Sequence, residues 1–197
     1  MVSSSKALDQ LAAEALECTN CPLYQHATQT VFGSGHSGAR LMLVGEQPGD
    51  EEDKQGEPFV GPAGKLLRKA LDEAGIDVDQ LYLTNVVKHF KWKPSSGWRR
   101  LHQKPNRSEI EACKPWLEEE VAMIQPPLIV GLGATACQAL LGPNLKVTKS
   151  RGQVFDWEGL SVFVTVHPSS ILRSREIGEA DYSALVADLV AARGFLT

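Results

Sequence analysis

The stretch that decides the fold class is Leu41-Met-Leu-Val-Gly-Glu-Gln-Pro-Gly49. Its first four residues form an uninterrupted apolar run, which is typical of a strand buried on both faces, as in a parallel sheet. The glycines and the proline that follow predict a turn directly after that strand. A second segment, residues 62–74, has apolar residues at helical spacing, with Pro62 near its first turn and Gly75 at its end. A buried strand followed by a turn and a helix indicates an α/β protein.

The remaining segments repeat this alternation. Short apolar runs predict strands at residues 81–84 and 127–130, and alternation around Glu158-Gly159 predicts a hairpin within residues 154–166. Helices are expected at residues 6–17, from the capping box Ser108-x-x-Glu111 to about residue 123, at 134–141 and at 181–193. We therefore predict a single domain over residues 1–197, with a three-layer α/β/α architecture around a mainly parallel four-stranded sheet. Such sheets bind their ligands at the carboxyl ends of the strands.

The composition is that of an ordinary globular protein. Hydrophobic residues make up 43% of the 197 residues, and charged residues make up 22%. No apolar run approaches the roughly 20 residues that a membrane span needs. Residues 1–11 also lack the apolar core of a secretory signal. We expect a cytoplasmic protein with no membrane-bound part, and we expect it to act as a monomer.

The charge is distributed unevenly along the chain. The net charge is −4, yet residues 86–115 contain eight lysines and arginines against two glutamates. This segment therefore carries +6, and the rest of the chain carries −10. An acidic body with one basic segment is typical of a loop that contacts phosphates. A solvated charged loop would give the same counts.

The four cysteines suggest a bound metal or cluster. Disulfides are not expected in a chain without an export signal. Cys18 and Cys21 form a C-x-x-C motif, and Cys113 and Cys137 lie far downstream. A redox C-x-x-C would follow a strand and open a helix, whereas this motif ends the helical segment 6–17. Ligation of a metal or an iron–sulfur cluster is therefore the first interpretation, and a redox pair is the second.

Several polar segments follow predicted strands, and their order resembles the uracil-DNA glycosylase superfamily. The resemblance covers almost the whole chain. It is carried by the C-x-x-C motif and by Gly45-Glu-Gln-Pro-Gly49, Pro58-Phe-Val-Gly-Pro-Ala-Gly64, Thr84-Asn-Val-Val-Lys88, Cys113-Lys-Pro-Trp-Leu117, Leu132-Gly-Ala-Thr-Ala136 and His167-Pro-Ser-Ser-Ile-Leu-Arg173. It implies a DNA-repair enzyme that excises uracil from single- and double-stranded DNA.

The resemblance also implies a role for each polar strand end. Such an enzyme flips the base out of the DNA and holds it by stacking and by hydrogen bonds to its edge. Phe59 matches the stacking aromatic residue, and Asn85 matches the amide that reads the uracil edge. Glu46 and Gln47 match the residues that face the water or the sugar. His167 matches the histidine that stabilises negative charge on the departing uracil.

Further contacts with DNA follow from the same resemblance. Gly45, Ser169 and Arg173 are expected at the substrate. Ser170 and Leu172 belong to the loop that presses on the minor groove in relatives, where an apolar wedge helps to unstack the base. Without the resemblance, Phe59 would be interpreted as a core residue and Asn85 as a strand-end cap.

Two departures from other cluster-bearing relatives point to the UdgX type, which cross-links itself to DNA. The first lies after the strand at 81–84, where those relatives have Lys-Cys-Arg-Pro and this chain has Lys88-His-Phe90. A [4Fe–4S] cluster would then have three cysteines and one histidine as ligands, which is chemically permissible. These ligands are Cys18, Cys21, His89 and Cys113. Cys137 is the alternative fourth ligand, but it lies within a predicted helix at an apolar packing position, so we prefer His89.

The second departure is a longer gap after His89, which predicts a basic loop insertion at about residues 90–107. It contains Trp98-Arg-Arg-Leu-His-Gln-Lys104, which is similar to a K/R-R-I/L-H insertion of the UdgX type whose histidine attacks the sugar. By this resemblance, His102 forms a covalent adduct with C1′ of the abasic sugar. Adjacent cations disfavour the protonated imidazole and keep a ring lone pair available. The cations expected to clamp phosphates around His102 are Arg99, Arg100 and Lys104.

Three other functions stay open at this point. Gly131-x-Gly133-x-x-Ala136 follows a strand and opens a helix, as in dinucleotide-binding proteins. It lies on the third strand, however, and no acidic residue ends a following strand about 20 residues later. A cluster-containing DNA-binding module without catalysis would not need Glu, Asn and His at three strand ends. The closest enzymatic alternative is an ordinary hydrolytic uracil-DNA glycosylase that turns over.

Overall fold

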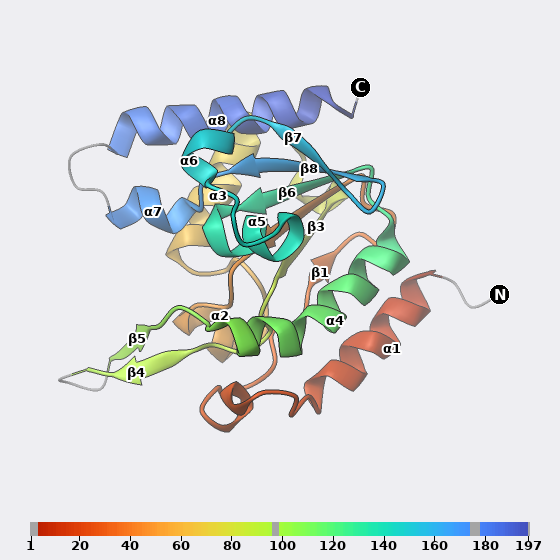
Figure 1. Cartoon of the computed structure of the whole chain (residues 1–197), viewed down its shortest axis with the longest axis vertical. Coiled ribbons are helices and arrows are strands. Elements are labelled where there is room, and N and C mark those ends of the chain that lie inside the picture. Colours follow the sequence, from red (N-terminus) through yellow and green to blue (C-terminus); the bar gives the residue numbers. More distant parts are fainter. Residues whose placement is uncertain (1–3, 96–98, 174–177, 197) are drawn as a thin grey trace.

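The computed structural model describes residues 4–95, 99–173 and 178–196. Within these residues, one six-stranded sheet forms the centre of the molecule, with the strand order β1-β3-β2-β6-β8-β7 (Figure 1). The strands are β1 (Ser34–Gly35), β2 (Leu41–Gly45), β3 (Leu81–Asn85), β6 (Leu128–Leu132), β7 (Val154–Trp157) and β8 (Leu160–Thr165). The four inner strands are parallel, as predicted, whereas β1 and β7 pair antiparallel at the edges. The two edge strands extend the expected four-stranded sheet to six strands.

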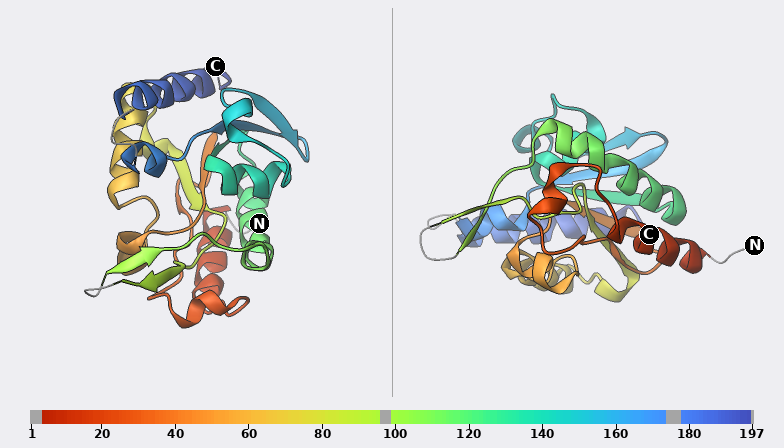
Figure 2. Two further views of the ribbon diagram at one scale, coloured as in Figure 1. Left: turned by 60° about the vertical axis from the view of Figure 1, so that its left-hand side comes forward. Right: turned by 90° about the horizontal axis from the view of Figure 1, so that it is seen from below.

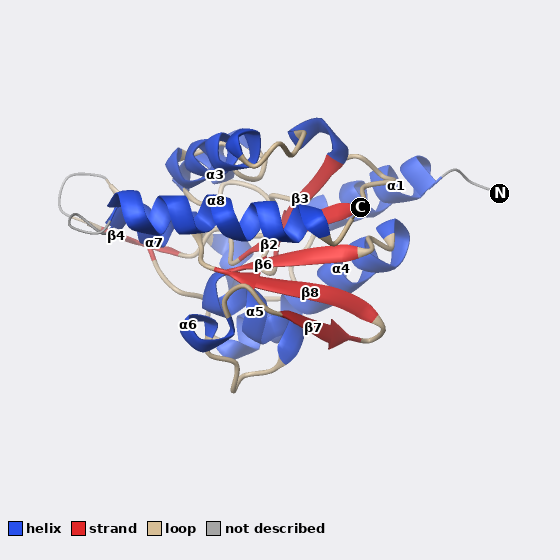
Figure 3. Ribbon diagram, turned by 90° about the horizontal axis from the view of Figure 1, so that it is seen from above, coloured by secondary structure: helices blue, strands red, loops and turns tan. Residues whose placement is uncertain are grey.

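Helices cover both faces of this sheet, as Figure 3 shows from above. One face packs against α3 (Pro62–Glu73), α7 (Pro168–Arg173) and α8 (Gly178–Gly194), and the other against α1 (Ser4–Leu16), α4 (Arg107–Ile124) and α5 (Gly133–Leu141). The connections contain α2 (Asp50–Gln55), α6 (Val147–Ser150) and the 3-10 turns Pro22–Gln25 and Val78–Gln80. The predicted three-layer α/β/α architecture is confirmed. In the described part of the chain, no helix is long and apolar enough to cross a membrane.

Strand β2 shows why the sheet needs apolar residues on both faces. Every residue of β2 is buried. Because side chains alternate along a strand, Leu41 and Leu43 pack into the core under α3 and α8, and Met42 and Val44 pack into the core under α1, α4 and α5. The uninterrupted apolar run is thus the sequence signature of a central strand between two helical layers.

The start of α4 differs from the prediction. The expected capping box Ser108-x-x-Glu111 is wrong, since the helix begins two residues earlier with Asn106 as its N-cap. The Asn106 side chain accepts a hydrogen bond from the Glu109 backbone at 2.9 Å. The Glu109 carboxylate in turn accepts one from the Asn106 backbone at 2.7 Å. Asn is as good an N-cap as Ser, and here its reciprocal bond with Glu109 decides the helix start.

The basic segment between β3 and α4 forms a hairpin of its own. Strands β4 (Trp92–Pro94) and β5 (Arg100–His102) pair antiparallel in a separate two-stranded sheet, which projects from the body of the molecule (Figure 2). The sequence predicted only a basic loop at about residues 90–107. Trp98 of the predicted insertion lies outside the described residues. His102 is the last residue of β5, where the chain returns from the hairpin to the body.

Candidate active site at the carboxyl ends of the strands

A cavity of about 370 Å³ opens at the carboxyl ends of β2, β6 and β8. Its lining residues come from three strand ends, from the end of the hairpin and the residues after it, and from α6 and α7. The cavity therefore brings together many of the residues that the sequence predicted for the site, and these are Glu46, Gln47, His102, Lys104, His167, Ser169, Ser170 and Arg173.

Glu46 and His102 face each other in this cavity. One Glu46 carboxylate oxygen, Oε1, lies 3.4 Å from His102 Nε2. The other oxygen, Oε2, accepts a hydrogen bond from the Thr135 hydroxyl, which fixes the orientation of the carboxylate. Burial lowers the pKa of His102 below its ordinary value, against the opposing effect of Glu46 and with a smaller contribution from Arg173. The lowered pKa favours the neutral imidazole in a side chain that is still 44% exposed, with the Glu46 carboxylate beside it.

His167 is held as a neutral hydrogen-bond donor. Its Nδ1 accepts a hydrogen bond from the Ser169 backbone N–H at 3.1 Å, and the Ser169 hydroxyl lies 2.9 Å from the same atom. Since Nδ1 is an acceptor, the ring proton belongs on Nε2. Burial, with contributions from Arg173 and His102, lowers the pKa of His167 to about 4. The ring is thus neutral at physiological pH and can donate one hydrogen bond from Nε2.

Phe59 and Asn85 meet above Gly45, the last residue of β2. A Cβ atom added to Gly45 would lie 2.3 Å from Asn85 Oδ1 and 2.8 Å from Phe59 Cζ, so only glycine fits there. Asn85 and Phe59 are both buried, and the Phe59 ring is stacked on His167 with 6.4 Å between centroids. The Phe59 ring therefore lies between the predicted base-reading amide and His167, behind the residues that line the cavity of about 370 Å³, which include His167 but not Phe59 or Asn85.

The backbone of Phe59 has an unusual conformation. Its φ angle is 59°, in the left-handed region that bulky residues seldom adopt. Gly64, in the first turns of α3, makes this conformation possible, because a Cβ there would lie 1.9 Å from the Phe59 carbonyl oxygen. Backbone strain of this kind concentrates at functional sites, which supports a functional role for the Phe59 ring.

Gln47 holds the base of the hairpin. Its side-chain amide donates hydrogen bonds to the backbone carbonyls of Lys91 at 3.2 Å and Gln103 at 3.1 Å. Its carbonyl oxygen accepts one from the Lys91 backbone at 3.2 Å. The expected role of Gln47 at the water or the sugar stays a prediction, while the observed contacts fix the residues on both sides of the hairpin that carries His102.

Arg100 is also engaged inside the protein. Its guanidinium forms ion pairs with Asp50 and Asp53 and lies over the rings of Trp92 and Phe90, with centroid distances of 5.5 and 5.4 Å. These contacts attach the hairpin to α2. A phosphate contact for Arg100 therefore stays a prediction, and the guanidinium would have to exchange its carboxylate partners to make one.

The other predicted DNA-contacting side chains are open to solvent. Arg99, which precedes His102 in the chain, and Lys104, which follows it, are both exposed. Ser170 is exposed at the cavity rim. Leu172 is a large apolar side chain with 51% exposure. Their positions are compatible with an approaching nucleic acid.

The predicted cluster ligands lie between α1, α4 and the end of β3. Cys18, Cys21 and Cys113 are buried thiols, and burial raises the pKa of Cys113 to about 12, with smaller contributions from Cys18 and Cys21. Two N–H groups point at their sulfur atoms: the Lys88 backbone donates to Cys113 at 3.2 Å, and the Trp116 indole donates to Cys18 at 3.1 Å. N–H donors of this kind stabilise cysteine thiolates that ligate a cluster.

His89 and Cys137 differ in their relation to these three cysteines. His89 is buried and shares a cavity of about 220 Å³ with Cys18. Its Nε2 lies 3.0 Å from the Thr30 hydroxyl, and its Nδ1 has no hydrogen-bond partner among the described residues. Cys137 lies in α5, where its thiol donates to the Gly131 carbonyl at 3.2 Å.

Three buried thiols and one imidazole are a donor set that an iron–sulfur cluster can use. No three His, Cys, Asp or Glu side chains of the described ranges converge as they would around one metal ion. The ligands of a four-iron cluster instead bind separate irons and surround a larger space. The orphaned Nδ1 of His89 and the three buried cysteines are therefore compatible with cluster ligation.

Three residues of the site neighbourhood were not predicted to act there. Thr135 belongs to the 132–136 turn, and nothing in the sequence identifies it as the partner of Glu46. Lys88 and Glu120 form a fully buried ion pair at 2.6 Å, and the Lys88 ammonium also donates to the Asn85 carbonyl at 2.8 Å. The sequence gives no signal that Lys88 is buried, because its partner Glu120 lies 32 residues further along the chain.

Comparison with known proteins identifies the family. The model of the uracil DNA glycosylase superfamily matches residues 32–190. A type-4 uracil-DNA glycosylase of Thermotoga maritima is 39% identical over 177 residues, covering 89% of this chain and 88% of the relative. One of Sulfurisphaera tokodaii is 37% identical over 190 residues, covering 90% and 83%. A type-5 uracil-DNA glycosylase of Pyrobaculum aerophilum is 29% identical over 197 residues, covering 83% of each chain. The strand-end site and these matches lead to one conclusion: the chain belongs to the uracil-DNA glycosylase superfamily.

Proposed function

We propose that this protein excises uracil from DNA and then bonds His102 covalently to C1′ of the abasic sugar. The observation that carries the proposal is the position of His102, which lies 3.4 Å from the Glu46 carboxylate in the same cavity as His167. A histidine that merely contacted a phosphate would have no need of a partner carboxylate at the centre of the site.

Release of the base uses groups from three strand ends. The flipped uracil would stack on Phe59, and the Asn85 amide offers both a donor and an acceptor to the uracil edge. When the bond between C1′ and the base nitrogen breaks, its electrons pass to the uracil and the sugar becomes oxocarbenium-like. The Nε2–H of neutral His167 donates to the uracil oxygen on which charge develops, and the Glu46 carboxylate stabilises the cationic sugar.

Capture of the sugar follows from the neutral state of His102. The ring nitrogen that holds the lone pair bonds to the electrophilic C1′, and the resulting imidazolium loses the proton from its other nitrogen. Glu46 is positioned to accept that proton. A well-oriented intramolecular nucleophile has an effective concentration on the order of 10⁵ M or more, which exceeds that of water by several orders of magnitude. The imidazole is therefore expected to capture the sugar before water does.

Denaturing gels test this proposal. Wild-type protein mixed with a uracil-containing single strand should give a shifted band that survives SDS and heat. His102→Ser should lose the band and still release uracil, because water then reaches the sugar. Glu46→Gln and His167→Ala should lose both release and cross-linking. A wild-type protein that turns over many substrates without a heat-stable band would contradict the covalent step.

An ordinary hydrolytic uracil-DNA glycosylase is the second candidate. The type-4 uracil-DNA glycosylases that are 37–39% identical to this chain favour it. The same gel separates the two candidates, since a hydrolytic enzyme releases uracil in excess of the enzyme concentration and leaves free abasic DNA.

We further propose that the chain holds a [4Fe–4S] cluster. The residues that would hold it are Cys18, Cys21, His89 and Cys113. Bound there, the cluster would supply a fixed cross-link between α1, the end of β3 and α4, next to the Lys88 backbone. Purified protein should absorb broadly near 400 nm, and His89→Ala should lower its iron content. Cys137→Ala is the matched control and should keep its iron. If Cys137→Ala loses iron and His89→Ala keeps it, Cys137 and not His89 is the fourth ligand.

A further inference from the structure

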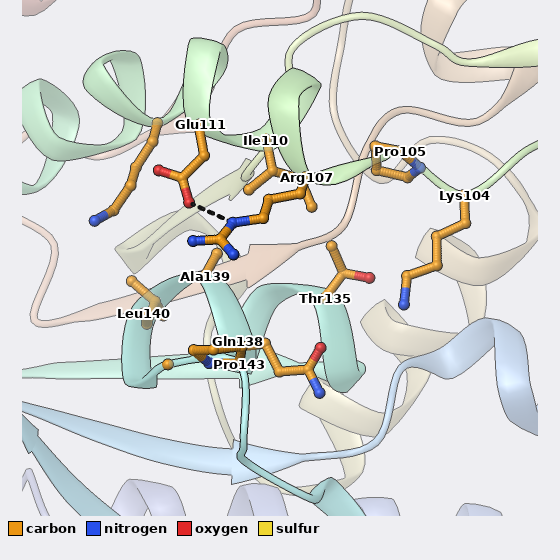
Figure 4. A pocket seen from close by; sticks show the side chains of 12 residues that line it. Lys104, Pro105, Arg107, Ile110, Glu111, Thr135, Gln138, Ala139, Leu140 and Pro143 are labelled. Carbon is orange, nitrogen blue, oxygen red and sulfur yellow. Dashed lines mark ion pairs between the residues drawn. The ribbon is translucent and has the colours of Figure 1, made fainter.

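A second cavity lies beside the candidate active site. It has a volume of about 480 Å³ and runs between the first half of α4 and α5 (Figure 4). Lys104 and Thr135 line both cavities. The groove is therefore continuous with the site where the flipped nucleotide would lie.

The groove combines apolar walls with a cationic rim. Its apolar side chains come from both helices and from the loops beside them, and they include Pro105, Ile110, Ala139, Leu140 and Pro143. Figure 4 shows Lys104 and Arg107 at the same groove, with the Arg107 side chain extending from the start of α4 toward Glu111 of the same helix. Lys114 also lines the groove, and its ammonium pairs with Glu118 at 3.1 Å, so three cations stand here against two carboxylates, Glu111 and Glu118. This local excess stands out in a chain whose net charge is −4.

The rim cations are free to meet an anion. Lys104 has no hydrogen bond or ion pair with any described residue, and it is exposed. Arg107 contacts Glu111 at 3.8 Å, but the two side chains are 88% and 60% exposed. Exposed pairs of this kind contribute little and exchange easily. An incoming phosphate can therefore take the place of Glu111.

We propose that this groove binds an unpaired nucleotide of the same DNA strand, next to the uracil nucleotide. Its base would lie on the apolar walls, and Lys104 and Arg107 would bind its phosphates. A base paired in a duplex would not be available to enter the groove, so the groove favours single-stranded DNA. The proposal rests on the proposed excision of uracil, because that function places the DNA strand in the adjoining cavity.

Filling the groove tests the apolar contact. Ala139→Trp would place an indole in the space proposed for the base. With a single-stranded oligonucleotide that has uracil at its centre, the second-order rate constant of uracil release should fall about tenfold, near the lower end of what one aromatic-stacked base contributes, because the groove walls are aliphatic. Two shortened oligonucleotides place uracil at the 5′ or at the 3′ end. One of them lacks the nucleotide that would enter the groove, so the rate constants of variant and wild type should be equal on that substrate. An equal loss on all three substrates, or no loss on any, would overturn the proposal.

Charge variants at exposed positions provide a test that does not depend on the fit of an indole. Arg107→Ala should reduce the slope of log affinity against log salt for an unmodified single strand by about 0.7. Glu111→Gln should tighten binding of the same strand, whereas Glu119→Gln, an exposed position of α4 outside the groove, should not. Unchanged salt slope in Arg107→Ala, or equal effects of the two glutamine variants, would contradict the proposal.

These outcomes are separable from those of the proposed function. A wild-type protein that releases no uracil refutes the excision activity, and the binding measurements on the unmodified strand still decide the groove. A wild-type protein that releases uracil while all groove variants behave like wild type keeps the activity and removes the groove.

Discussion

Replacing Gln47 with alanine should separate capture of the sugar from release of the base. Gln47 makes three hydrogen bonds of 3.1–3.2 Å to the backbone of Lys91 and Gln103, which flank the hairpin. It makes none to Asn85 or His167, the groups proposed to act on the uracil. Its loss should therefore loosen the position of His102 and leave the machinery of excision in place.

The structure allows the size of this effect to be worked out. Each hydrogen bond contributes about 0.5–1.5 kcal/mol net, so the three together contribute about 1.5–4.5 kcal/mol. Gln47 is 7% exposed, and water entering the space left by its side chain would recover part of this energy. We take about 2 kcal/mol as the free energy by which the near-attack position of His102 is destabilised. This corresponds to a rate of adduct formation about 30-fold lower.

Single-turnover kinetics on a uracil-containing single strand would measure both steps. Released uracil and the heat-stable band are followed in the same samples, so that each rate constant comes from one reaction. Gln47→Ala should show a lower rate of adduct formation and a larger share of free abasic DNA. The exposed Gln10→Ala in α1 is the control. Equal decreases in release and capture would refute the reasoning, since they would show that Gln47 acts on excision itself.

Four other changes have expected outcomes. Asn85→Ala should weaken discrimination for uracil by about 1–3 kcal/mol, measured as the ratio of kcat/KM values for uracil and cytosine substrates, and an unchanged ratio would remove Asn85 from the base pocket. The lowered pKa of His102 moves protonation of its imidazole below the ordinary histidine value of about 6.5, so the midpoint of the fall in adduct formation with falling pH should lie below 6.5; a midpoint at or above 6.5 contradicts this. Lys88→Met leaves the Glu120 carboxylate buried without its cation and should cost about 3–5 kcal/mol of unfolding free energy in urea, part of which Lys88→Met with Glu120→Gln should recover. Cys113→Ser should remove iron and the absorption near 400 nm, and full iron content in this variant would exclude Cys113 as a ligand.

The central sheet was predictable because its signals are local. The apolar run of β2 needs no knowledge of the rest of the chain, since a strand between two helical layers is apolar on both faces. The edge strand β1 has only Ser34 and Gly35, which carry no periodicity, and β4 and β5 are three residues each. Elements this short are fixed by their pairing partners and not by their own sequence.

The partners within the site were less predictable for a related reason. Glu46 and His102 were identified separately, but their mutual contact depends on how the hairpin is anchored. Those anchors link distant parts of the chain, since Arg100 pairs with Asp50, 50 residues away. Contacts across such separations come from the folded arrangement, and one sequence alone does not contain them.

The separate hairpin has a consequence for how such proteins diversify. No strand of the central sheet uses the β4–β5 hairpin as a hydrogen-bonding partner among the described residues, so the hairpin can change in length and sequence while the strand order is inherited unchanged. Under the proposed function, the fate of the DNA product is then encoded in one transferable segment. Grafting that segment onto a relative that turns over should also require docking residues such as Gln47, Asp50 and Asp53, because their contacts hold the hairpin that carries the histidine.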